Sequence, residues 1–168
     1  MKKILLVLLA FLTVCFVFFL SRMPYTQQSI IPELQTLLAD EPFKEQLSKI
    51  ELTYWNETIS VETRGYHYFI EFLIRKFSHF AGYGIVGIIF CLLFIRLKWR
   101  FAPFLAIASV FVVACIDETI QYYTPGRTGI FDDVIIDVCG ATLFVSIFWL
   151  LYILSKKSKK RSKKTRKG

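Results

Sequence analysis

Residues 117–137 read DETIQYYTPGRTGIFDDVIID, and this polar stretch lies between two strongly apolar segments of the chain. Its ionisable and amide side chains are closely spaced: Asp117, Glu118, Gln121, Arg127, Asp132, Asp133 and Asp137. Charged groups at the rim of a bilayer or inside it are energetically costly, so they usually mark a functional site. We therefore interpret the rest of the chain as a frame that holds this stretch at one face of a membrane.

The composition is that of a small integral membrane protein. The chain has 168 residues, of which 55% are hydrophobic and 17% are aromatic. Such values exclude an ordinary soluble domain. The sequence has no CxxC motif and no Cys/His spacing, and its four cysteines lie in four different apolar segments. We therefore expect them to be small apolar residues, without a disulfide or a zinc site.

Four apolar segments are near the length of about 17–25 residues that a membrane-spanning helix needs. We place the spans at residues 4–20, 76–95, 101–119 and 130–154. The first span follows a basic start at residues 1–3, and we expect it to be retained because no small-x-small cleavage pattern follows it. The predicted fold class is all-α, a polytopic membrane protein with four transmembrane helices.

Residues 21–75 are predicted to form an extracellular loop and the start of a long helix over residues 66–97. Spaced apolar residues near Leu34 and Leu47 indicate two short amphipathic helices in this loop. The long helix would measure about 48 Å, more than the hydrocarbon core of about 30 Å, so its first third should project from the bilayer or lie on its surface. The basic tail, residues 155–168, is expected to be disordered.

The distribution of charge predicts the orientation in the membrane. Of the 21 Lys and Arg residues, two lie in the basic start, three in residues 96–100 and nine in the tail. All 13 acidic residues lie elsewhere. The positive-inside rule places these three basic segments, and so both termini, in the cytoplasm. The start of the second helix, the end of the third and the start of the fourth then share the outer face of a multi-pass cell-membrane protein.

Helical spacing gathers the polar side chains of three helices into stripes. The stripes consist of Lys76, His79 and Tyr83 on the second helix, Asp117, Glu118 and Gln121 on the third, and Asp133 and Asp137 on the fourth. Asp137 lies about 10 Å inside its helix, too deep for a solvated surface residue, whereas Asp132 points elsewhere. We expect the stripes to face one another and to form a polar pocket at the extracellular face.

The chain resembles the VanZ-like membrane proteins in a combination of motifs over residues 21–154. These motifs are Lys76-x-x-His79-x-x-x-Tyr83, Asp117-Glu118-x-x-Gln121, Arg127, Asp133, Asp137 and Gly140, and Pro24-Tyr25-x-x-Gln28 is similar to the Gram-positive branch. Many members have Asn where this chain has Asp137, which adds a carboxylate here. The resemblance implies a cell-envelope role and a link to tolerance of teicoplanin, a glycopeptide antibiotic that binds cell-wall precursors. It implies no defined reaction.

Three functional interpretations remain open. In the first, the pocket binds the head group of a polyprenyl-linked or other envelope lipid, and Lys76 and Arg127 pair with its phosphate. The remaining ligand-binding candidates in this interpretation are Tyr83, Asp117, Gln121, Asp133 and Asp137. In the second, the protein is an enzyme acting on such a lipid, with His79 or Glu118 as the acid or base. In the third, the charges form a structural ion-pair network, and the first loop binds a protein partner that the sequence does not identify.

No cofactor is expected unless His79 joins Asp117, Glu118 or Asp133 around a divalent metal ion, which is a variant of the enzyme interpretation. The sequence contains no GxSxG elbow, P-loop or zincin motif. Nucleic acid is not an expected partner, because the basic tail joins a membrane helix directly.

Several candidates also have simpler structural interpretations. His79 could be a packing residue hydrogen-bonded to Tyr83, and Lys76 could extend to the membrane interface without a partner. Arg127 could cap the turn at residues 124–126, and Gly140 could serve helix packing.

Overall fold

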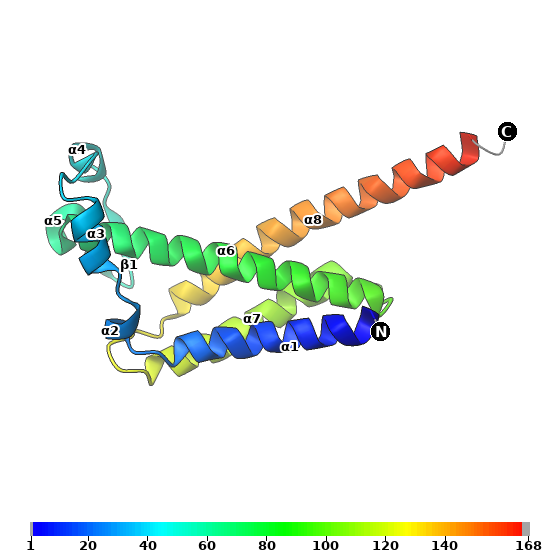
Figure 1. The fold of residues 1–168 in the computed structure, drawn as a ribbon, viewed down its shortest axis with the longest axis horizontal. Coiled ribbons are helices and arrows are strands. Elements are labelled where there is room, and N and C mark those ends of the chain that lie inside the picture. Colours follow the sequence, from blue (N-terminus) through cyan, green and yellow to red (C-terminus); the bar gives the residue numbers. More distant parts are fainter. Residues whose placement is uncertain (1, 166–168) are drawn as a thin grey trace.

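The computed structural model describes the backbone of residues 2–165 and the side chains of residues 3–158. Within this range, four helices are long and apolar enough to cross a membrane. They are α1 (Lys2–Ser21), α6 (Tyr66–Arg96), α7 (Ala102–Tyr122) and α8 (Phe131–Thr165). Figure 1 shows α1, α6 and α7 running along one another, while the C-terminal part of α8 leaves the bundle. The prediction of an all-α membrane protein with four such helices is confirmed.

The segment between α1 and α6 forms a small folded cap at one end of the bundle (Figure 1). Its elements are α2 (Tyr25–Gln28), α3 (Ile31–Leu37), α4 (Lys44–Leu47), β1 (Leu52–Tyr54), β2 (Glu57–Ile59) and α5 (Val61–Arg64). The two short helices expected in this segment are α3 and α4. Ile59, Val61, Tyr66 and Phe69 form a buried apolar cluster, so the cap is anchored to the first turns of α6.

The antiparallel hairpin of β1 and β2 was not predicted from the sequence. Leu52 pairs with Ile59 and Tyr54 with Glu57, which leaves Trp55 and Asn56 as a two-residue turn. Both turn residues have positive φ, 51° and 57°, the backbone sign that a type I′ hairpin turn requires. This hairpin brings Tyr54 to the start of α8.

Glycines allow α6 and α8 to cross closely. A Cβ on Gly140 would lie 2.0 Å from the carbonyl oxygen of Phe80, and one on Gly87 would lie 2.9 Å from Val145. Small residues permit such close approach between membrane helices. Gly82 differs, because no neighbouring atom of the described chain lies within 4 Å of a Cβ built there. Gly82 therefore borders open space, whereas Gly87 and Gly140 serve packing.

The fourth helix is longer than predicted, because α8 continues to Thr165. The expectation of disorder is therefore wrong for residues 155–165. This segment contains no Gly or Pro, Lys and Arg have good helix propensity, and cations are favourable near a helix C-terminus. Residues 166–168, the remainder of the predicted tail, lie outside the described residues.

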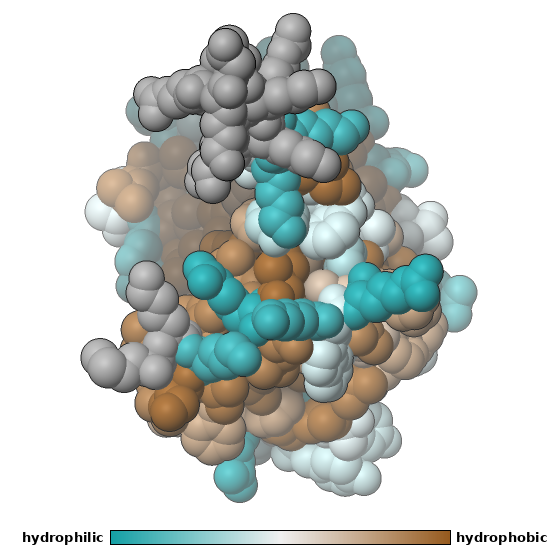
Figure 2. Space-filling view, turned by 90° about the vertical axis from the view of Figure 1, so that its right-hand side faces the viewer, coloured by the Kyte–Doolittle hydropathy of each residue, from teal (hydrophilic) through white to brown (hydrophobic). Residues whose placement is uncertain are grey.

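The basic and the acidic parts of the chain lie at opposite ends of the bundle. Figure 2 looks at the end away from the cap, where long hydrophilic side chains lie over an otherwise hydrophobic surface. Lys3, Arg96 and Lys98 line a cavity of about 920 Å³ at this end. The C-terminus of α7 and the N-terminus of α8 lie at the other end, next to the cap (Figure 1), and this position concentrates the predicted site residues there.

Candidate functional site

The loop between α7 and α8 turns tightly, so the polar residues at both helix ends meet. A Cβ on Gly129 would lie 2.1 Å from the carbonyl oxygen of Glu118, so this approach requires glycine. The backbone N–H of Ile130 donates to Glu118 Oε2 at 3.0 Å. Glu118 therefore fastens the entry of α8 to the last turns of α7, a structural role for a residue proposed from the sequence as an acid or base.

Gln121 links two carboxylates to an arginine. Its amide nitrogen donates to Asp117 Oδ2 at 2.9 Å and to Glu118 Oε1 at 3.0 Å. Its amide oxygen accepts from Arg127 Nη1 at 2.8 Å. Ser21, the last residue of α1, donates to the other oxygen of Asp117. The carboxylates are thus held in place mainly by neutral donors, and Arg127 reaches them through Gln121.

His79 of α6 pairs with Asp137 of α8. His79 Nδ1 lies 3.2 Å from Asp137 Oδ1, and Asp137 is 0% exposed. Among the described side chains and backbone groups, Asp137 Oδ2 has no hydrogen-bond partner. The His79 and Tyr83 rings stack with centroids 6.2 Å apart. His79 thus packs against the Tyr83 ring, but its hydrogen-bond partner is Asp137 and not Tyr83 as the packing interpretation expected.

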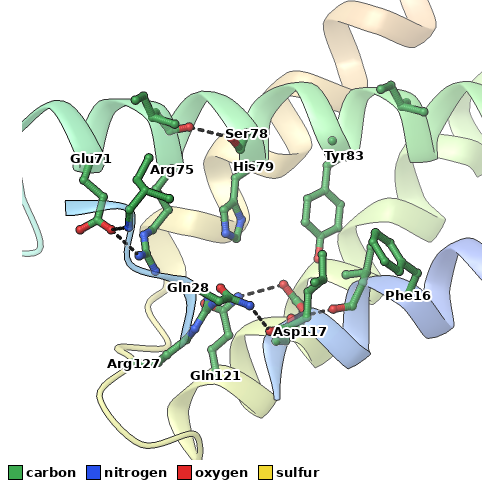
Figure 3. A pocket seen from close by; sticks show the side chains of 17 residues that line it. Phe16, Gln28, Glu71, Arg75, Ser78, His79, Tyr83, Asp117, Gln121 and Arg127 are labelled. Atoms are coloured by element: carbon green, nitrogen blue, oxygen red, sulfur yellow. Dashed lines mark hydrogen bonds and ion pairs between the residues drawn. The ribbon is translucent and has the colours of Figure 1, made fainter. Parts of the chain in front are cut away.

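Tyr83 points from α6 toward Asp117, as Figure 3 shows. The residue is 4% exposed, and its hydroxyl has no hydrogen-bond partner within the described part of the chain. A buried hydroxyl without a partner is unusual in a native protein. The Tyr83 hydroxyl is therefore a donor available to a bound group at this site.

Lys76 and Asp133 form an ion pair at the side of the site nearest the cap. The Tyr54 hydroxyl donates to the same carboxylate, and Lys76 Nζ lies 4.4 Å from the centroid of the Tyr54 ring. Burial raises the pKa of Tyr54, and its bond to Asp133 raises it further. Lys76 is thus engaged within the protein. Asp132 points elsewhere, as predicted, and accepts from the backbone N–H of Trp55 at 3.1 Å.

The sequence interpretation missed two site residues, Glu71 and Arg75. Glu71 is buried and accepts from the Tyr25 hydroxyl at 2.5 Å and from the Ile30 N–H at 2.9 Å. The Arg75 guanidinium lies 3.5 Å from Glu71 and 4.8 Å from the centroid of the Tyr25 ring. A signal for both residues was present in the sequence: Glu71 and Arg75 are opposite charges at i, i+4 spacing, just before Lys76.

Besides Lys76, the site contains two other positively charged side chains, Arg75 and Arg127 (Figure 3). Burial and the positive charge of Arg75 lower the pKa of Arg127, while three carboxylates act in the opposite direction. Arg127 Nε is buried and has no hydrogen-bond partner among the described residues. The guanidinium therefore contacts Gln121 rather than the loop turn, and its Nε donor is free within the described chain.

Two cavities meet at these polar residues. The first, of about 480 Å³, extends between α1 and α6 and is lined by apolar residues that include Phe16, Leu20 and Ile85, with Gly82 among them. The second, of about 520 Å³, lies under the cap and is lined by polar and aromatic residues. Both are bordered by Glu71, Arg75, His79, Gln121 and Arg127. Figure 3 shows the first cavity with these side chains at its polar end.

All nine site residues predicted from the sequence lie in this one region, as ion-paired, hydrogen-bonded or cavity-lining side chains. Four of them form a compact donor group: His79, Asp117, Glu118 and Asp137 each offer one atom, and these atoms lie within 4.8 Å of one another.

The sequence model of the VanZ/LLP1 family matches residues 6–153 of the chain. No curated protein and no solved structure matches the chain.

Proposed function

The chain belongs to the VanZ/LLP1 family, and we propose that this membrane protein binds an anionic lipid of the cell envelope in its two adjacent cavities. The phosphate of the lipid occupies the polar cavity, and its hydrocarbon chain occupies the apolar one. The observation that carries the proposal is that an apolar cavity and a polar cavity lie side by side and share Arg75 and Arg127 among their lining residues. An amphipathic ligand matches this division.

The apolar cavity suits a hydrocarbon chain. Phe16 and Leu20 border it from α1, and Ile74 and Ile85 border it from α6, two helices that are apolar enough to contact the bilayer core. Its volume of about 480 Å³ falls within the range of about 300–1,000 Å³ that is typical of ligand pockets. Gly82 keeps the side of α6 open within this cavity.

The polar cavity suits a phosphate. Arginine binds phosphate through two parallel N–H donors, and Arg127 has a buried Nε without a partner in the described chain. An anion between Arg75 and Arg127 would also relieve the repulsion between the two guanidinium groups. Because Lys76 is paired with Asp133, the proposed phosphate partners are Arg75 and Arg127. The carboxylates of Glu71 and Asp117 would accept hydrogen bonds from sugar hydroxyl or amine groups.

We also propose that the site faces the outside of the cell. The basic residues near the opposite end of the bundle support this orientation through the positive-inside rule. The ligand would then be a polyprenyl-linked or other lipid in the outer leaflet. Sequestering a cell-wall precursor there would reduce its access to teicoplanin, which is the proposed route to glycopeptide tolerance.

A second candidate function is an enzyme acting on the same lipid. The contact of His79 with Asp137 at 3.2 Å, at the junction of the cavities, favours this reading, because a carboxylate can orient a histidine that acts as a general base. The candidate residue is His79 rather than Glu118, whose two oxygens already accept from Gln121 and Ile130. His79→Gln would then retain the lipid but stop its conversion.

Native mass spectrometry of the purified protein with a polyprenyl phosphate tests the lipid proposal. We expect wild type to retain the lipid, and the Arg75→Gln/Arg127→Gln variant to lose at least tenfold in retention. Gly82→Leu fills the apolar cavity and should have the same effect. The matched control is Cys139→Leu, which places the same leucine side chain at an exposed position of α8. Equal retention by all four proteins would contradict the proposal.

A further inference from the structure

We infer that His79, Asp117, Glu118 and Asp137 bind a divalent transition-metal ion. Each residue offers one ligand atom, and the four atoms lie within 4.8 Å of one another. Ligand atoms bound at about 2.0–2.2 Å to one tetrahedral zinc ion lie about 3.3–3.6 Å apart. Side-chain shifts of up to about 0.7 Å would therefore bring the four donors onto a single ion. The inference does not require a bound lipid.

Two buried polar atoms point to a ligand independently of the carboxylate cluster. Asp137 is 0% exposed, and its Oδ2 has no hydrogen-bond partner in the described part of the protein. The Tyr83 hydroxyl is also buried and unpartnered there, and Tyr83 points toward Asp117 (Figure 3). A metal ion would take Asp137 Oδ2 as a ligand. The Tyr83 hydroxyl would donate to a water or phosphate oxygen on the ion.

The charge around the group also favours a cation. Asp117, Glu118 and Asp137 are all buried, and like charges gathered inside a membrane protein are costly without compensation. The nearby Lys76 is paired with Asp133. A doubly charged ion together with Arg127 would offset the three carboxylates, while His79 serves as a neutral nitrogen ligand.

The surrounding hydrogen bonds hold the proposed ligands in position. Gln121 donates to both Asp117 and Glu118, Ser21 donates to Asp117, and the Ile130 N–H donates to Glu118. Outer groups of this kind orient ligands in metal sites and raise metal affinity. The four residues come from α6, α7 and α8, so a bound ion would also fasten these three helices together.

The donor set indicates which ions fit. Imidazole nitrogen suits zinc and other late transition metals, whereas carboxylates also suit Mn²⁺. One nitrogen with three carboxylates, and no thiolate, therefore favours an ion between Mn²⁺ and Zn²⁺ over Ca²⁺ or Mg²⁺. We expect Zn²⁺ to bind more tightly than Mn²⁺.

The test uses the full chain in detergent, freed of metal by a chelator and then titrated with Zn²⁺ by calorimetry. We expect one equivalent to bind, with at least tenfold weaker binding in Asp137→Asn and in His79→Gln. The matched control, Asp132→Asn, lies outside the group and should bind like wild type. An excess of Zn²⁺ should also raise the unfolding temperature of wild type, and should raise that of Asp137→Asn by less at the same concentration.

Electron paramagnetic resonance of Mn²⁺ on the wild-type protein provides a readout that needs no variant. Coupling to an imidazole nitrogen is expected, because His79 is the proposed nitrogen ligand. The metal site would be overturned by any of three results. These are no stoichiometric binding of Zn²⁺, no coupling of Mn²⁺ to a nitrogen, or equally weakened Zn²⁺ binding in Asp132→Asn and Asp137→Asn. Retention of the polyprenyl phosphate is measured on the same samples. Failure of the metal proposal can therefore be distinguished from failure of the lipid proposal.

Discussion

His79 on α6 and Asp137 on α8 are 58 residues apart in the sequence, and their side chains lie 3.2 Å apart where the two helices cross. The contact depends on the backbone next to it. Phe80 follows His79, and Gly140 lies one turn after Asp137; the missing Cβ of Gly140 leaves room for the carbonyl oxygen of Phe80. The position of the site thus depends on a glycine that carries no polar group.

Gly140→Ala is expected to destabilise the protein. Its Cβ would lie 2.0 Å from the Phe80 carbonyl oxygen, so α6 and α8 must separate. Overpacking costs about 1–3 kcal/mol, which exceeds the gain of about 1 kcal/mol in helix propensity. Gly82→Ala is the matched control, because its Cβ meets no described neighbour within 4 Å, and it should not destabilise. Unfolding in detergent measures both; equal stability of the two variants would contradict the close crossing.

The ion pair of Lys76 and Asp133 should behave as a coupled unit. Lys76→Met leaves a buried carboxylate without its cation, which costs about 3 kcal/mol, the lower end of the usual range, because the Lys76 side chain is 16% exposed. Lys76→Met/Asp133→Asn should cost less than Lys76→Met alone. A double-mutant cycle on unfolding free energies measures the coupling, and additive effects would show that the pair contributes nothing. Arg64→Met, in the exposed pair with Glu57, should cost less than about 1 kcal/mol.

The helices and the polar stripes were predictable because helical periodicity is a local property of the sequence. Spacings of three and four residues place Lys76, His79 and Tyr83 on one face of a helix wherever that helix packs. Asp137 was placed in the pocket because its depth in an apolar segment left few alternatives. The structure brings these residues together as expected.

The hairpin and the cavities were not predictable by the same reasoning. Type I′ turns usually carry Asn-Gly or Asp-Gly, and here Trp55 and Asn56 adopt the positive φ values instead. The cavities depend on how α1 packs against α6, a relation between segments that no local pattern encodes. For that reason the roles of Arg75 and Gly82 emerged only from the structure.

The orientation predicted from charge can be measured by cysteine labelling. In a background without the four native cysteines, Asn56→Cys places a thiol in the exposed hairpin turn, and Ser155→Cys places one at an exposed position of α8. A membrane-impermeant maleimide should label Asn56→Cys on intact cells and Ser155→Cys only after permeabilisation, because the positive-inside rule keeps the basic end inside. The reverse pattern would place the site in the cytoplasm.

Photo-crosslinking with an anionic lipid that carries a diazirine in its hydrocarbon chain tests the central claim most directly. If the chain lies in the cavity between α1 and α6, mass spectrometry should map the cross-links to the lining residues: Phe16, Val17, Leu20, Ile74, Gly82 and Ile85. Gly82→Leu should abolish them, and Cys139→Leu should not. Cross-links spread evenly over the exposed apolar residues of α7 and α8, and unchanged in Gly82→Leu, would contradict the account.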